Sequence, residues 1–167
     1  LGLSGNPGTY TDPQKTLADA RGRLTGNNIR LLFKRGEDWT DSLTLLNLSS
    51  RTNIHIGSYS SAVDGSDDPT LPKPKMTKTG GANLIVATDS VDCRIMNIEL
   101  HSNNTGYCIH ASGCVNLLVS KVSLNDAGKG INIGSGNLGV QPIAHRAQYF
   151  CIYDSTIQNV GFAANDN

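Results

Sequence analysis

Apolar and polar residues alternate along this chain in a pattern that returns at regular intervals. In DCRIMNIEL (residues 92–100) the apolar positions are Cys93, Ile95, Ile98 and Leu100, and in NLLVSKVSL (residues 116–124) they return as Leu117, Val119, Val122 and Leu124, at an offset of 24 residues. At an offset of 33, FCIYDSTIQN places Phe150, Ile152, Ser155 and Ile157 on the same positions. A period of roughly 20 to 50 residues is typical of stacked units that cannot bury their apolar face alone.

Each repeat has room for three short strands separated by bends, and equivalent strands would stack at about 4.8 Å. The sequence therefore predicts an all-β fold, a right-handed parallel β-helix solenoid of about four to five coils with a short N-terminal capping helix. Equivalent residues of successive coils form a column, which we call a file. The files predicted to point inward are Ile85/Ile109/Ile131, Ala87/Ala111/Ile133, Ile95/Val119/Ile152 and Leu100/Leu124/Ile157. The predicted outward files are Val86/His110/Asn132, Glu99/Ser123/Thr156 and, near a bend, Asn97/Lys121/Asp154. An antiparallel sandwich also has short alternating strands, but it does not require constant columns at these offsets.

The expected organisation has two parts. Residues 1–28 form a turn and the capping helix, with Asp12 as N-cap, Pro13 at the first helical position and an apolar stripe on the helix. Residues 29–167 form the coils, with a long irregular loop at 60–81 and an insertion at 134–147. Inward positions of the first coils are expected at Leu43, Leu45, Ile54 and Ile56.

Composition and charge narrow the class of protein. The chain has 18 Gly among its 167 residues, which favours tight bends, and 14 basic residues balance 14 acidic ones. Zero net charge without charge clusters argues against general affinity for nucleic acid or anionic membranes. No apolar run reaches the roughly 18 residues that a membrane-spanning helix needs.

Four cysteines are present, and their spacing does not resemble a paired metal site. Cys93 shares an inward column with Leu117 and Phe150, which indicates a buried thiol. A disulfide between Cys108 and Cys114 stays open as an alternative, and Cys151 has no assigned partner.

The segments SGNPGTYTDPQKTLADA and LLFKRGEDW, together with DCRIMNIEL and NLLVSKVSL, carry a resemblance to a known group. Over most of residues 4 to 160 the chain resembles secreted right-handed parallel β-helix proteins of the pectate-lyase-like superfamily. Its N-terminal region is similar to polysaccharide lyases of the alginate-lyase and chondroitinase type. The resemblance implies an extracellular or cell-surface protein that binds an acidic polysaccharide and cleaves it by β-elimination. Ca²⁺ is a possible cofactor on the same grounds, although the repeats contain no acidic cluster.

Members of that group are typically longer than this chain. We therefore expect a fragment, or a protomer of a homo-oligomer, in which further coils or another chain cover the last coil.

Candidate site residues follow from the outward files and the insertion. The insertion would wall a groove and bring His145 and Arg146 near the strand that carries Asn132, above His110, with Lys129 at the rim. The expected catalytic residues are His110, His145 and Arg146, and the expected substrate-binding residues are Lys129, Asn132 and Lys121. No metal ligands are assigned.

Three functions fit the sequence. A polysaccharide lyase is favoured through the resemblance, and an epimerase or glycoside hydrolase could use the same scaffold. The alternative is a non-catalytic module, either structural or carbohydrate-binding, such as a tailspike-like shaft, an adhesin or a matrix protein.

Overall fold

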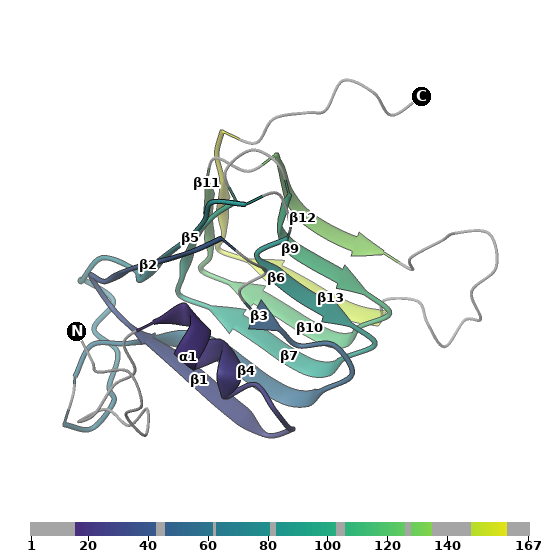
Figure 1. Cartoon of the computed structure of the whole chain (residues 1–167), viewed down its shortest axis with the longest axis horizontal. Helices are drawn as coiled ribbons and strands as arrows, with labels where there is room; N and C mark the ends of the chain where they lie inside the picture. Colours follow the sequence, from purple (N-terminus) through teal and green to yellow (C-terminus); the bar gives the residue numbers. More distant parts are fainter. Residues whose placement is uncertain are drawn as a thin grey trace.

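A computed structural model of the chain describes residues 16–42, 46–61, 63–80, 83–102, 106–125, 128–134 and 148–159. These residues form an all-β fold with one short helix, and the strands lie in three sheets around a common core (Figure 1). We call the three sheets A, B and C. Each time the chain goes once around the core, it adds one strand to each sheet in that order.

The strands of each sheet follow one another in chain order. Sheet A contains β1 (Ile29–Lys34), β4 (Thr52–Tyr59), β7 (Val91–Met96), β10 (Val115–Ser120) and β13 (Gln148–Tyr153). Sheet B contains β2 (Asp38–Asp41), β5 (Lys75–Lys78), β8 (Glu99–His101), β11 (Ser123–Asn125) and β14 (Thr156–Ile157). Sheet C contains β3 (Leu46–Asn47), β6 (Ile85–Thr88), β9 (Tyr107–Ser112) and β12 (Lys129–Gly134).

Every strand pairing in the described residues is parallel. This finding contradicts the antiparallel sandwich. The register pairs the residues of the expected columns: Val119 with both Ile95 and Ile152, and Ile109 with both Ile85 and Ile131. The last members of the columns are not buried as the sequence predicts: Phe150, Ile152 and Ile157 are 55 %, 45 % and 53 % exposed, because they lie on β13 and β14, the edge strands of their sheets. Ile95, Val119, Ile85 and Ile109 are each 0 % exposed, so burial of the repeated aliphatic positions fixes the register.

Two kinds of bend recur at the sheet corners, and both need a residue in the left-handed region. Between sheets A and B the bend residues are Asn97, Lys121 and Asp154, with φ of 54°, 54° and 48°. Between sheets C and A they are Ser50, Asp89 and Gly113, with φ of 57°, 50° and 65°. At each corner the bend N–H donates to a carbonyl of the next pass, as Lys121 does to Tyr153 at 3.0 Å and Asp89 to Ser112 at 2.8 Å. The bends of successive coils are therefore joined by backbone hydrogen bonds, as the strands are.

The helix begins later than the sequence predicts. Helix α1 (Leu17–Gly22) has Thr16 as its N-cap, not Asp12, and Asp12 and Pro13 lie outside the described residues. The Thr16 hydroxyl accepts from the Asp19 N–H at 3.1 Å, and the Asp19 carboxylate accepts from the Thr16 N–H at 3.3 Å. This reciprocal pair is a capping box, which satisfies two backbone donors at once.

The apolar side of α1 joins the core at the β1 end of the sheets. Leu17, Ala20 and Leu24 are buried, and the helix contacts β2. Of the expected inward positions in the first coils, Ile54 and Ile56 are buried, whereas Leu43 and Leu45 lie outside the described residues. Leu46 and Leu48 are buried in the same region, so that strand has the opposite phase to the one expected.

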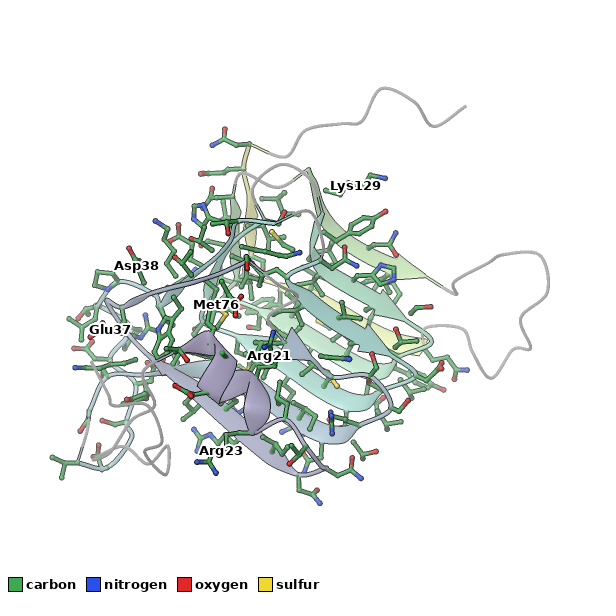
Figure 2. All side chains as sticks on the ribbon, in the orientation of Figure 1. Arg21, Arg23, Glu37, Asp38, Met76 and Lys129 are labelled. Atoms are coloured by element: carbon green, nitrogen blue, oxygen red, sulfur yellow. The ribbon has the colours of Figure 1, made fainter. Side chains whose placement is uncertain are left out.

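The sequence predicts a long irregular loop at 60–81, but the described part of this segment contains a strand and an ion pair. Its last part contains β5, whose Met76 is 0 % exposed and lies inside the molecule between the sheets (Figure 2). Upstream, Asp67 accepts hydrogen bonds from Arg35 Nε at 2.6 Å and Nη2 at 2.9 Å. The acidic stretch at 65–68 is thus anchored by an ion pair.

All four cysteines are free thiols. Burial raises the pKa of Cys93 and of Cys108 to about 11, and Cys108 and Cys114 donate to the carbonyls of Leu100 and Ala87 at 3.5 and 3.1 Å. The possible disulfide between Cys108 and Cys114 is therefore absent, and Cys93 is the buried thiol that the sequence predicts.

Candidate functional site

The outward side of sheet C gathers three of the expected site residues around a tyrosine. Strand β9 supplies Tyr107 and His110, and β12 supplies Lys129 and Asn132. Tyr107 pairs with Lys129 and His110 with Asn132 in the parallel register. We call these four residues the Tyr107 cluster. Lys129 projects from β12 at the edge of sheet C (Figure 2).

Tyr107 contacts each of the other three side chains. Its ring centroid lies 5.4 Å from that of His110, with the two planes tilted by 32°. The Lys129 ammonium lies over the ring at 5.3 Å from the centroid, a cation–π contact worth about 0.5–1 kcal/mol at an exposed site. Asn132 Nδ2 donates to the Tyr107 hydroxyl at 3.3 Å.

The hydrogen bonds leave reactive groups available in this cluster. Because the Tyr107 oxygen accepts from Asn132, its own proton can be donated to another acceptor. His110 Nδ1 is shielded from solvent and has no hydrogen-bond partner among the described residues. An unpaired buried ring nitrogen is costly, which makes His110 a candidate for a functional role.

The strands position this cluster through the core on their other side. Ile109 and Ala111 of β9 are fully buried, so His110 between them faces away from the core. The backbone N–H of Tyr107 donates to the Asn83 side chain at 3.1 Å. The cluster therefore sits on a strand whose direction and register are fixed from within.

The structure separates Lys121 from the other expected site residues. Lys121 is the left-handed bend residue between β10 and β11, at the corner of sheets A and B, whereas Lys129 and Asn132 lie on sheet C. His145 and Arg146 fall between β12 and β13 in the chain and lie outside the described residues. Their expected roles stay predictions.

Tyr107 is the residue that sequence reasoning missed. The signal available was its register: it lies 22 residues before Lys129, as His110 lies before Asn132. An aromatic ring beside an expected outward His is a candidate platform for a sugar ring.

A second polar group lies on sheet B, and its members bind one another. Glu99 Oε1 lies 2.6 Å from His101 Nε2 and accepts from Asn125 Nδ2 at 3.3 Å. Lys73 Nζ donates to the Ser123 hydroxyl at 2.9 Å. The Glu99–Asn125 bond joins the neighbouring strands β8 and β11, so we interpret the group as a polar network that stabilises the sheet.

Two further observations concern ions and membranes. Within the described residues, no three His, Cys, Asp or Glu side chains come together as they would to hold a metal ion. In the same part of the chain, no helix has the length and hydropathy required to cross a bilayer.

Comparison with known proteins gave no match to this chain among family models, curated proteins or solved structures.

Proposed function

We propose that this chain is a right-handed parallel β-helix solenoid that binds an acidic polysaccharide through the Tyr107 cluster and cleaves it by β-elimination. The observation that carries the proposal is the convergence of a phenol, an imidazole, an ammonium and an amide on one outward sheet face. On the fold, support comes from three parallel sheets visited in turn by one chain. The resemblance of the repeats to secreted β-helix proteins extends the proposal to a secreted location.

The chemistry of β-elimination matches the groups in the cluster. A base removes the proton at C5 of a uronic acid, the electron pair of that bond forms the C4–C5 double bond, and the C4–O bond to the leaving sugar breaks. The leaving oxygen takes a proton from an acid. A cation or amide donor must also hold the carboxylate, because negative charge develops on it when C5 loses its proton.

Each side chain has a role in this scheme. His110 is the proposed base, because imidazole is the side chain that most often accepts a proton in general acid–base catalysis. Tyr107 is the proposed acid, because the bond from Asn132 leaves its proton free to be donated. Lys129 and Asn132 are proposed to hold the carboxylate. His145 and Arg146 stay candidates for the same groove, since the segment that carries them follows β12.

The test is direct. The chain is incubated with polygalacturonate, alginate and chondroitin, with and without Ca²⁺, and the ultraviolet absorbance of unsaturated uronide ends is followed. We expect a signal with one of the three, and we expect Tyr107→Phe and His110→Ala to reduce the initial rate by about 10²-fold or more, the usual contribution of a general acid or base.

Two matched variants control for general effects. Tyr153→Phe removes the hydroxyl of an exposed tyrosine on sheet A, and Lys121→Ala removes a cation at the corner of sheets A and B. Both should retain the wild-type rate. If Tyr107→Phe retains full activity as well, the cluster is not the site. If no polymer gives a signal under any condition, the lyase proposal fails.

A second candidate function is non-catalytic glycan binding. It is favoured by the way the four side chains already contact one another, because side chains held in place before binding lose less conformational freedom when a glycan binds. Binding of a uronate oligomer that is lost in Tyr107→Ala, without release of unsaturated ends, would select this function over the lyase.

A further inference from the structure

The outward side of sheet A carries three parallel files of side chains across β1, β4 and β7. The first, called the amide file after its two asparagines, is Asn28, which directly precedes β1, with Asn53 and Asp92. The cationic file is Arg30, His55 and Arg94, and the apolar file is Leu32, Gly57 and Met96. The register pairs Arg30 with His55, His55 with Arg94 and Leu32 with Gly57. This face belongs to a different sheet from the Tyr107 cluster.

The amide file is built into the backbone. Asn28, Asn53 and Asp92 have φ of 58°, 56° and 55°, a conformation that Asn and Asp adopt more readily than other residues with a side chain. Asn53 Nδ2 donates to Asn28 Oδ1 at 2.9 Å. This bond leaves the amide donor of Asn28 and the carbonyl of Asn53 available to hydroxyl groups.

The cationic file places an arginine on either side of a histidine, on three successive strands. Arg30 is exposed. Arg94 Nη2 donates to both oxygens of Asp92 at 3.1 Å, and Asp92 is the single acidic residue of β1, β4 and β7. Burial, followed by the charges of Arg30 and Arg94, lowers the pKa of His55. The potential at this file is therefore positive, although the whole chain is neutral.

The apolar file provides a shallow surface beside the charges. Gly57 has no side chain, and the His55 imidazole lies over it: a Cβ added at Gly57 would meet His55 Nε2 at 2.8 Å and Leu32 Cδ2 at 3.3 Å. The ring thus lies along the sheet between the two arginines. Leu32 and Met96 are partly exposed on either side of Gly57.

We propose that this face of sheet A is a second, non-catalytic binding site for an acidic polysaccharide, whose chain crosses β1, β4 and β7 with its anionic groups on the cationic file. Neighbouring strands are about 4.8 Å apart, a step comparable with the length of one sugar ring. One sugar can therefore lie on each strand, with hydroxyls toward the amide file and its C–H face on the apolar file.

The same face is a poorer fit for nucleic acid. The three files contain no Trp, Tyr or Phe on which bases could stack. Three cation-forming side chains, one of them partly neutralised by Asp92, are also fewer than a phosphate backbone usually engages.

The experiment uses the full chain carrying Lys129→Ala and Asn132→Ala, which removes the polar contacts of the Tyr107 cluster. Binding of oligogalacturonate is measured by calorimetry at low salt, with a sulfated oligosaccharide, a neutral malto-oligosaccharide and single-stranded DNA as comparison ligands. We expect both acidic oligosaccharides to bind and the neutral one not to bind. In this background Arg30→Ala and Arg94→Ala should each weaken binding about tenfold, the usual loss for a charge-assisted hydrogen bond.

Two further variants sharpen the result. Lys34→Ala removes a cation of β1 that lies outside the cationic file and contacts Glu37 at 3.9 Å, so it should change the affinity less than twofold. Asp92→Asn keeps a residue that tolerates the left-handed conformation but releases Arg94, so it should tighten binding. Retention of folding in every variant is checked by circular dichroism.

Binding should also strengthen as the pH falls. The groups that face His55 are Arg30 from β1 and Arg94 from β7, with Asp92 paired to Arg94, and an anion laid on this file offsets their repulsion and favours protonated His55. Affinity should therefore rise as the pH falls below the ordinary histidine pKa of about 6.5, and His55→Gln should remove this dependence.

Several outcomes would overturn the proposal. These are loss of all binding in the Lys129→Ala/Asn132→Ala background, equal affinity after Arg30→Ala and Arg94→Ala, and equal binding of the neutral oligomer. Tighter binding of DNA through the same arginines would reassign the face to nucleic acid. None of these results depends on whether the Tyr107 cluster is catalytic.

Discussion

The ion pair between Arg35 and Asp67 is expected to be the strongest single anchor of the segment between β4 and β5. Asp67 accepts from Arg35 Nε and Nη2 and from the Ser58 hydroxyl, at 2.6, 2.9 and 2.9 Å. Arg35 also donates from Nη1 to the Leu71 carbonyl at 2.8 Å. Because the Arg35 side chain is only 3 % exposed, Asp67→Ala leaves a buried guanidinium with a single carbonyl acceptor.

The magnitude follows from the burial of the two partners. Breaking a buried pair by removing one partner costs about 3–5 kcal/mol. The Asp67 side chain is 25 % exposed, so water reaches the vacated position and screens part of the penalty. We expect Asp67→Ala to lower the free energy of unfolding by about 2–4 kcal/mol. Asp67→Asn, which can still accept one hydrogen bond, should cost less.

Urea denaturation followed by circular dichroism measures the change, with Asp64→Ala as the control because Asp64 is an exposed carboxylate of the same segment. The control should shift the midpoint by a small fraction of the Asp67→Ala shift. A double-mutant cycle with Arg35→Met should give a coupling energy well above zero. Coincident midpoints for wild type and Asp67→Ala, or strict additivity in the cycle, would refute the reasoning.

The pH dependence gives an independent check. The bonds from Arg35 hold the pKa of Asp67 below its usual range. A carboxyl with a lowered pKa contributes stability above its unfolded pKa of about 3.9, and the contribution is lost as the pH falls through the folded value. Wild type should therefore lose more stability than Asp67→Ala below about pH 4.

Three further predictions concern the core, the backbone and the thiols. Val119→Asp should unfold the chain, at a cost of roughly 4 kcal/mol or more, because Val119 is 0 % exposed and a buried carboxylate there has no partner; a soluble variant with cooperative melting would contradict the core assignment. Tyr149 has φ of 54°, and the equivalent residues at the other strands of sheet A are Asn or Asp. Tyr149→Asn should therefore raise the free energy of unfolding by about 1 kcal/mol. An unchanged melting temperature would argue against the strained backbone. Exposed Cys151 should react with a maleimide in the native state, whereas buried Cys93 and Cys108, with pKa values raised to about 11, should react only after denaturation; mass spectrometry with and without denaturant tests this difference.

The sequence predicted the pairing within the inward columns well, because burial of apolar side chains is the main determinant at these positions. Ile95 and Val119 must leave water, and the period at which such residues return specifies both the strand and its neighbour. The expected pairings of Ile95 with Val119 and of Ile109 with Ile131 accordingly appear in the register. Where several apolar residues stand together, as in LTLLNL, the period has two possible phases, and the burial of Leu46 and Leu48 shows the one that the sequence did not favour.

Outward side chains are less predictable, because their contacts depend on rotamers and on segments distant in the chain. The file of His110 and Asn132 could be read from the offsets, but the position of Tyr107 among His110, Lys129 and Asn132 could not. The pairing of Arg35 with Asp67, 32 residues later, was likewise invisible, since Asp67 has the surroundings of a solvated turn in the sequence.

Repetition of the same pattern of aliphatic residues thus determined by itself which strands are neighbours and, up to β11, which of these side chains lie inside. Burial acts on every copy of the repeat in the same way, so it leaves a periodic record in the sequence. The charge pairs, the capping box at Thr16, the Tyr107 cluster and the charged face of sheet A were decided only by the tertiary structure. Each of them depends on the distance between particular polar atoms, and such distances leave no periodic trace.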